Sequence, residues 1–239
     1  MDDSHLKNGA GAELFPERLL ASLTAERLLA VFTVTDPDDA PPLARALVRG
    51  GIRVMELAWR TDATLEALRA IRSEVPEMLA GIGTLLTVDQ MEAVQAAGAA
   101  FGVSPGLSTK LLRAARDLGF PYAPGVMTPS ELQVALEYGC RTLKFFPAES
   151  GGGLKQLRAM NAPFAHLRPR YIVLGGLTED NAAAYLDEPS VAALGGSWIT
   201  GGGLIAARDW DGIKRRARAA RKAVERSAYA ESHSVAASK

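Results

Sequence analysis

The stretch YAPGVMTPSELQVALEYGCRTLKFF, residues 122–146, decides the fold. It begins and ends with short apolar runs, Tyr122–Pro124 and Thr142–Phe146, whose length suits buried strands. The segment Pro129–Tyr138 between them has apolar residues at helical spacing. A strand, a helix and a second strand in this order predict a parallel pair of strands that the helix connects.

The same alternation runs along most of the chain. We expect strands at Leu28–Val34, Ile52–Ala58, Met78–Thr84, Phe101–Ser104, Tyr122–Pro124, Thr142–Phe146, Tyr171–Leu174 and Val191–Leu194. Helices are expected at Asp38–Arg49, Thr61–Glu74, Val88–Ala97, Thr109–Leu118, Pro129–Tyr138 and Glu179–Leu186, and a capping hydroxyl precedes four of them, at Thr87, Ser108, Thr128 and Thr178. This pattern predicts an α/β protein, a (β/α)8 TIM barrel. An open doubly wound sheet is disfavoured because no Gly-x-Gly-x-x-Gly turn follows the first strand.

The length of 239 residues fits a single barrel domain, which we place at residues 15–226. Residues Phe15–Ala25 form an extra N-terminal helix in this prediction and close the bottom of the barrel. The polar ends, residues 1–14 and 227–239, are expected to be disordered tails.

Composition excludes several classes of partner and chemistry. No apolar stretch approaches the ~20 residues of a membrane span, and the polar N-terminus does not resemble a secretory signal. Lys plus Arg and Asp plus Glu balance at 27 each, which argues against nucleic acid as a partner. The one cysteine, Cys140, fits a reducing cytoplasm. With only three histidines, a catalytic metal site is not expected, and we predict no cofactor.

Lys144 is the strongest catalytic candidate. It lies in RTLKFFPAE, residues 141–149, and its neighbours Leu143, Phe145 and Phe146 are apolar. Burial disfavours the charged ammonium form, and a neutral amine is the nucleophile that Schiff-base chemistry with a ketone or aldehyde needs. The alternative is a strand-end lysine whose stem is covered while its head reaches solvent.

Glu56 and Arg60 belong to the second expected strand and its end. Side chains alternate between the two faces of a strand, so these two residues share a face, and Lys144 shares one with Phe146. If both faces point to the barrel axis, Glu56, Arg60 and Lys144 converge at its mouth. Glu56 then suits proton transfer and Arg60 suits a carboxylate. The alternative is a salt bridge between Glu56 and Arg60.

Other strand ends carry hydroxyl groups and glycines. The Thr84 hydroxyl follows the third strand and is placed to bind a carboxylate oxygen. Gly175-Gly176 and Gly195-Gly196-Ser197 follow the last two strands, where barrels often bind phosphate through backbone N–H groups. Pro105 belongs to a tight turn that shapes the site or simply connects a strand to a helix.

Together these residues resemble the family of 2-keto-3-deoxy-6-phosphogluconate (KDPG) and 4-hydroxy-2-oxoglutarate (KHG) aldolases. The matching motifs are MELAWRT at 55–61, GIGTLL at 81–86, VSPGL at 103–107, PGVMTPSEL at 124–132, KFFPAE at 144–149 and GGSW at 195–198. The resemblance implies a metal-independent class I aldolase of the Entner–Doudoroff pathway, usually homotrimeric, that yields pyruvate. It also implies roles for ten residues: the imine for Lys144, acid/base catalysis for Glu56, the pyruvate carboxylate for Arg60 and Thr84, the pocket wall for Pro105 and Phe146, and phosphate for Gly175, Gly176, Gly196 and Ser197.

Two positions depart from the pattern. Members of the family usually have Pro-Thr before the Gly-Gly pair, where this chain has Val173-Leu174, and many carry arginine late in the first strand, near Thr33. Both departures bear on the aldehyde end of the substrate. They also motivate a rival hypothesis, a non-catalytic trimeric barrel that binds a phosphorylated or keto-acid ligand.

Overall fold

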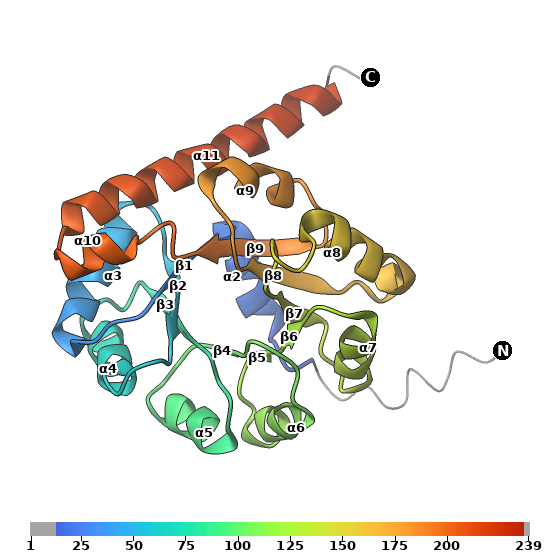
Figure 1. Ribbon diagram of the computed structural model, residues 1–239, viewed down its shortest axis with the longest axis horizontal. Coiled ribbons are helices and arrows are strands. Elements are labelled where there is room, and N and C mark those ends of the chain that lie inside the picture. The colour runs from blue at the N-terminus through green and yellow to red at the C-terminus, as the bar shows by residue number, and fades with distance from the viewer. Residues whose placement is uncertain (1–12, 237–239) are drawn as a thin grey trace.

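Parallel strands close into a ring in the computed structural model, which describes residues 13–236 (Figure 1). In the sheet of the described chain they follow the order β5-β4-β3-β2-β1-β9-β8-β7-β6, and every neighbouring pair is parallel. The strands are β1 (Leu28–Phe32), β2 (Val54–Ala58), β3 (Leu79–Gly83), β4 (Gly102–Val103), β5 (Tyr122–Ala123), β6 (Gly125–Val126), β7 (Thr142–Phe145), β8 (Arg170–Leu174) and β9 (Val191–Gly196).

The two ends of this order, β5 and β6, are consecutive in the chain with only Pro124 between them. They are the two halves of the expected fifth strand. Proline has no N–H to donate to the ladder, but its carbonyl accepts the Lys144 N–H at 2.8 Å. The predicted eight-stranded barrel is therefore confirmed, with its fifth strand divided at Pro124.

Helices surround the ring of strands (Figure 1). They are α2 (Glu17–Glu26), α3 (Ala40–Arg49), α4 (Thr64–Glu74), α5 (Val88–Ala96), α6 (Thr109–Leu118), α7 (Pro129–Glu137), α8 (Gly153–Asn161), α9 (Glu179–Leu186), α10 (Gly202–Ala206) and α11 (Trp210–Ala236), with 3-10 turns η1 (Pro37–Asp39) and η2 (Ala162–Leu167). All four predicted capping residues lie at N-cap positions, and Thr87 and Thr128 form capping boxes with Gln90 and Glu131.

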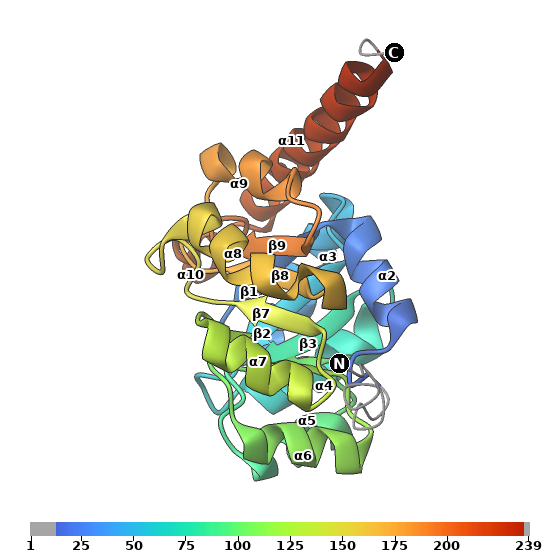
Figure 2. The same ribbon diagram turned by 90° about the vertical axis from the view of Figure 1, so that its right-hand side faces the viewer.

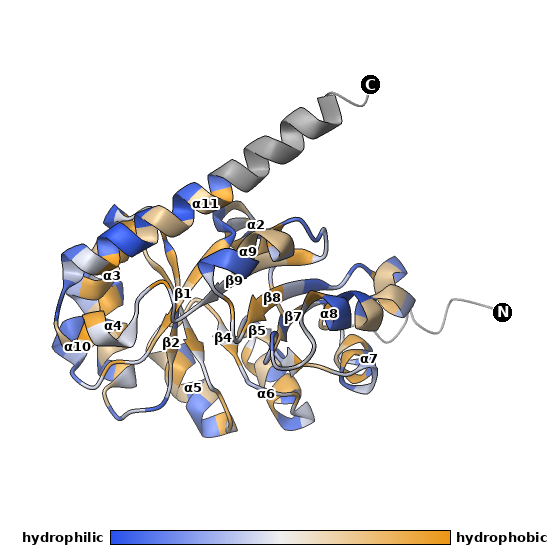
Figure 3. Ribbon diagram, turned by 45° about the horizontal axis from the view of Figure 1, so that its top comes forward, coloured by the Kyte–Doolittle hydropathy of each residue, from blue (hydrophilic) through white to orange (hydrophobic). Residues whose placement is uncertain are grey.

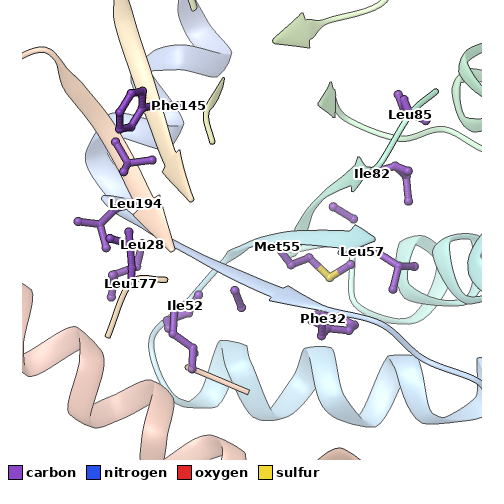
Figure 4. Packing of buried hydrophobic residues seen from close by; sticks show 14 of the residues in the cluster. Leu28, Phe32, Ile52, Met55, Leu57, Ile82, Leu85, Phe145, Leu177 and Leu194 are labelled. Atoms are coloured by element: carbon purple, nitrogen blue, oxygen red, sulfur yellow. The ribbon is translucent and has the colours of Figure 1, made fainter. Parts of the chain in front are cut away.

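The larger core layer lies between the strands and the helices. Leu57 of β2 points into it, as do Leu28, Ile82, Phe145 and the other residues labelled in Figure 4. Coloured by hydropathy, the strands are largely apolar and the polar residues concentrate on the outer helices (Figure 3). This distribution is typical of a barrel whose strands are covered by amphipathic helices.

A second, smaller core fills the inside of the barrel at its N-terminal end. It combines inward-facing strand residues with Phe15 and Leu23, which come from the N-terminal segment and α2. The rings of Phe15 and Phe101 are 5.9 Å apart, and both side chains are fully buried. The extra N-terminal helix therefore closes the barrel as predicted.

The chain ends differ from the predicted tails. Residues 1–12 and 237–239 lie outside the described residues, but Leu14 is buried and Glu13 accepts the N–H of Arg141. At the other end, α11 runs to Ala236 and projects beyond the barrel (Figure 2), so the expected tail at 227–239 is helical over most of its length. Its polar composition concealed the helix. None of the described helices is both long and apolar enough to cross a membrane.

Phe15→Ala is expected to lower the free energy of unfolding by about 3–5 kcal/mol, because it leaves a cavity where Phe15 packs on Phe101. Chemical denaturation monitored by circular dichroism measures the change. Leu86→Ala is the control, since Leu86 is 60% exposed and its truncation should stay within about 0.5 kcal/mol of the parent. A loss below about 1 kcal/mol for Phe15→Ala would contradict a structural role for the N-terminal segment.

Candidate active site

A cavity of about 770 Å³ opens at the C-terminal ends of the strands. This is the end at which TIM barrels carry their active sites. All ten residues that the sequence indicated line this cavity: Glu56, Arg60, Thr84, Pro105, Lys144, Phe146, Gly175, Gly176, Gly196 and Ser197. These ten residues come from six strands and the loops that follow them, and they meet in one place.

Lys144 and Glu56 form a buried ion pair. The Lys144 Nζ lies 3.0 Å from Glu56 Oε1 and 3.3 Å from Oε2. Lys144 is 5% exposed and Glu56 2%, so the lysine head does not extend into solvent. The ammonium also lies 5.1 Å from the centre of the Phe146 ring. The alternative of a Glu56–Arg60 salt bridge is not found, because Glu56 pairs with Lys144.

Two glycines of β3 make room inside the barrel for larger side chains from its neighbours. A Cβ atom at Gly81 would lie 2.3 Å from the ring of Phe101, and one at Gly83 would lie 1.8 Å from Glu56 Oε1. Gly81 thus leaves space for the Phe101 ring, and Gly83 leaves space for the Glu56 carboxylate that pairs with Lys144. This packing requires glycine at positions 81 and 83 of β3.

Arg60 and Thr84 both line the cavity. Arg60 follows β2, the strand of Glu56, and Thr84 follows the neighbouring strand β3. Arg60 is exposed, and no hydrogen bond or ion pair within the described part of the chain engages its guanidinium. Thr84 adopts φ of 63°, a left-handed conformation that is unfavourable for a β-branched residue. Backbone strain of this kind concentrates at functional sites.

Pro105 is held in place by a buried hydrogen-bond network beneath it. Ser104 Oγ donates to the Gly106 carbonyl at 2.6 Å and lies 2.5 Å from the Tyr122 hydroxyl. The Gly125 N–H also points at Ser104 Oγ, at 3.4 Å. Burial raises the pKa of Tyr122, so its hydroxyl keeps its proton and donates to the serine. Pro105 therefore lines the cavity on a turn that these hydrogen bonds hold in place.

The far end of the cavity contains the two positions that depart from the family pattern. Leu174 and Thr33 both line it, together with the predicted Gly175, Gly176 and Ser197. Further lining residues, which the sequence did not single out as site residues, lie on the segment after β9: Trp198, Thr200, Gly201, Gly202 and Ile205. The glycine run 201–203 was the available signal, because it lies in the loop after the last strand and barrel sites are built from such loops.

Thr200 is the missed residue with the most definite contacts. It is 1% exposed, and its hydroxyl lies 3.2 Å from the carbonyl oxygens of both Val31 and Ser197. Thr200 therefore ties the loop after β9 to β1. Among the described residues, no group of three or more His, Cys, Asp or Glu side chains could hold a metal ion.

The comparisons with known proteins agree with this fold and site. Residues 19–216 match the family model described as KDPG and KHG aldolase. The chain is 42% identical over 198 residues to the KHG/KDPG aldolase of Escherichia coli, which covers 83% of this chain and 92% of that protein. The 2-dehydro-3-deoxy-phosphogluconate aldolase of Dickeya dadantii is equally similar, at 42% identity over the same shares of the two chains.

Solved structures give the same result. The KDPG aldolase of Legionella pneumophila, with pyruvate captured as a covalent carbinolamine, superposes with a TM-score of 0.80 at 36% identity, over 84% of this chain and 97% of that one. The Zymomonas mobilis enzyme with 3-phosphoglycerate gives 0.77 at 35% identity, over 85% and 97%. The fold and the site define a class I, Schiff-base aldolase. The chain belongs to the KDPG and KHG aldolase family.

Gly83→Ala is expected to displace the Glu56 carboxylate, since the added methyl group would lie 1.8 Å from Glu56 Oε1. We expect kcat to fall by about 100-fold, the order of loss that misplacing or removing a general acid/base produces. Steady-state kinetics with a pyruvate-yielding substrate measure it. Gly106→Ala is the control, because a Cβ there meets nothing within 4 Å. Parental activity in Gly83→Ala would show that the position of Glu56 is not critical.

Proposed function

We propose that this protein reversibly cleaves KDPG to pyruvate and glyceraldehyde 3-phosphate, and KHG to pyruvate and glyoxylate, through an imine on Lys144. The observation that carries the proposal is the buried Lys144 amine 3.0 Å from the Glu56 carboxylate, inside the cavity where the family's motifs converge. The names of the relatives support the two substrates. The roles of Lys144 and Glu56 follow from the chemistry of an amine beside a carboxylate.

The reaction begins when the Lys144 amine attacks the C2 carbonyl of the keto acid. The amine must first lose a proton, and Glu56 is the acceptor within hydrogen-bond distance. Addition gives a carbinolamine, and loss of its hydroxyl as water gives the protonated imine. Its cationic nitrogen is the electron sink for the following step.

Cleavage then breaks the C3–C4 bond. The C4 hydroxyl loses its proton, the aldehyde leaves, and the bonding electrons pass into the imine to form an enamine. Protonation at C3 and addition of water release pyruvate and regenerate the amine. Glu56, as the carboxylate beside the nitrogen, is assigned the proton transfers of these steps, with water as relay.

Arg60 and Thr84 are assigned to the pyruvate carboxylate. The unpaired guanidinium at the cavity rim can form two parallel hydrogen bonds with a carboxylate, and the strained Thr84 directs a hydroxyl to the same end. Pro105 and Phe146 form walls beside the imine. Gly175, Gly176, Gly196 and Ser197 are assigned to the distal phosphate through backbone N–H groups and the serine hydroxyl.

The homotrimer, the cytoplasmic location and the metal-independent mechanism belong to the same proposal and rest on the family resemblance. The rival, a non-catalytic barrel, has less support. A protein that only bound its ligand would have no use for a lysine and a glutamate kept together out of water at high desolvation cost.

Incubation with pyruvate and borohydride is expected to attach a covalent adduct to Lys144. Borohydride reduces the imine to a stable secondary amine, which mass spectrometry of proteolytic peptides locates. Lys144→Arg should abolish the adduct, because a guanidinium does not form the imine. Lys110→Arg and Lys155→Arg are the matched controls and should retain it. No adduct on the parent protein, or one on another lysine, would refute the mechanism.

Leu174→Thr is expected to increase the preference for phosphorylated over unphosphorylated acceptor aldehydes. A hydroxyl that bonds a charged group contributes about 1.5–3 kcal/mol, or roughly ten- to a hundred-fold in kcat/KM. Aldol synthesis from pyruvate with glyceraldehyde 3-phosphate or glyceraldehyde measures the ratio. Leu174→Val is the control, since valine has the shape of threonine without its hydroxyl. Equal ratios in the two variants would show that Leu174 only packs the barrel.

A further inference from the structure

The Gly175–Gly176 loop is supported from behind by the segment that follows Lys144. The Ala148 N–H donates to the Leu174 carbonyl at 2.9 Å, and the Glu149 N–H donates to the Gly175 carbonyl at 3.0 Å. The chain from the imine lysine to Glu149 is therefore joined by its backbone to the loop that we assign to the distal phosphate.

Both glycines adopt positive φ, 102° at Gly175 and 80° at Gly176. A Cβ at Gly176 would lie 2.7 Å from the Cβ of Glu149, so the loop rests directly on the glutamate stem. The Gly176 carbonyl is also held, by the Asn181 side-chain amide at 3.3 Å. Both carbonyl groups of the loop are thus engaged away from the cavity, and no backbone hydrogen bond within residues 13–236 uses the N–H of either glycine.

The Glu149 carboxylate is in turn fixed from α9. The Tyr185 hydroxyl donates a short hydrogen bond to Glu149 Oε1, and Tyr185 is only 2% exposed although Glu149 itself is exposed. A Cβ at Gly153, the first residue of α8, would lie 3.5 Å from the Tyr185 hydroxyl and 3.6 Å from Glu149 Oε1. The Tyr185–Glu149 contact is therefore packed between α8 and α9.

Tyr185 keeps the proton that it donates. Burial raises the pKa of Tyr185, and the hydrogen bond and negative charge of Glu149 raise it further. Neither residue lines the cavity. Their contribution to the site passes through the Gly175–Gly176 loop, which does line it.

We propose that Tyr185 and Glu149 are positioning residues that hold the Gly175–Gly176 loop in the conformation that binds the distal anionic group of the substrate. This inference rests on the proposed function, in which that loop receives the phosphate. The pair sets affinity for the phosphorylated end of the substrate and leaves imine formation on Lys144 unaffected.

Tyr185→Phe removes the hydroxyl and keeps the buried ring. In aldol synthesis from pyruvate, we expect its KM for glyceraldehyde 3-phosphate to rise about three- to ten-fold, which is less than the ~100-fold loss from misplacing a reacting group directly. The KM for unphosphorylated glyceraldehyde and borohydride trapping of pyruvate should match the parent. Glu149→Ala should give the same KM increase without altering a buried residue, so it serves even if Tyr185→Phe folds poorly.

Rescue and control variants separate positioning from general stability. Glu149→Gln offers an amide oxygen to the Tyr185 hydroxyl and should return the KM to within about two-fold of the parent, since a neutral acceptor preserves a hydrogen bond. Tyr138→Phe is the matched control: it removes a tyrosine hydroxyl that accepts a hydrogen bond from Arg113 at 2.9 Å, and Tyr138 does not line the cavity. Its kinetics should equal those of the parent.

Two results would overturn the inference. One is an unchanged KM for glyceraldehyde 3-phosphate in both Tyr185→Phe and Glu149→Ala, and the other is an equal rise with unphosphorylated glyceraldehyde. A parent protein that neither traps pyruvate nor forms the aldol product would instead refute the proposed function. The two failures are therefore distinguishable.

Discussion

The ion pair between Lys144 and Glu56 is the constraint on which the rest of the structure depends. Two charges 3.0 Å apart and almost fully buried lose their hydration, and only a close partner compensates that cost. β3 must therefore leave space for the glutamate at Gly83, and β7 must place the lysine opposite it. The result is a buried lysine amine with a carboxylate within hydrogen-bond distance.

The two core layers support this ion pair in different ways. The outer layer, between strands and helices, fixes the positions of the strands, and the inner layer with Phe15 and Phe101 closes the barrel below the ion pair. The charged residues consequently lie between an apolar floor and a cavity of about 770 Å³ above. The cavity gives a ligand access to the Lys144 amine from the C-terminal side of the barrel.

Recognition differs between the two ends of the cavity. The end that we assign to the carboxylate has an unpaired guanidinium, that of Arg60, and the strained Thr84, and both groups suit a planar anion. The distal end has glycines, Ser197, Thr200 and the apolar Leu174. Among the described residues, Arg60 and Lys144 are the only lysine or arginine residues that line the cavity, so the distal end has no cationic side chain of its own among the lining residues. In the proposed function an anion at this end depends on backbone N–H groups, so the conformation of the Gly175–Gly176 loop sets its affinity.

The sequence by itself determined the class of the fold and the set of candidate residues that line the cavity. Alternating strand and helix patterns predicted the barrel. Strand alternation predicted that Glu56 and Arg60 share a face, because a period of two residues is a local property of the chain, and the structure shows that this face and that of Lys144 point into the cavity. Eight of the ten candidate residues lie at the C-terminal ends of strands or directly after them, and Glu56 and Lys144 lie within β2 and β7. The family motifs made the chemistry specific.

Only the tertiary structure decided which of these groups touch. Glu56 pairs with Lys144 and not with Arg60, which is nearer in sequence, and Gly83 leaves the space for that pair. Tyr185 forms a hydrogen bond with Glu149 from a separate helix, α9. Thr200, Trp198 and Ile205 enter the cavity because the chain after β9 folds back over it. Each of these contacts joins residues whose separation in space is set by the closure of the barrel and by side-chain packing, neither of which has a local signature in sequence.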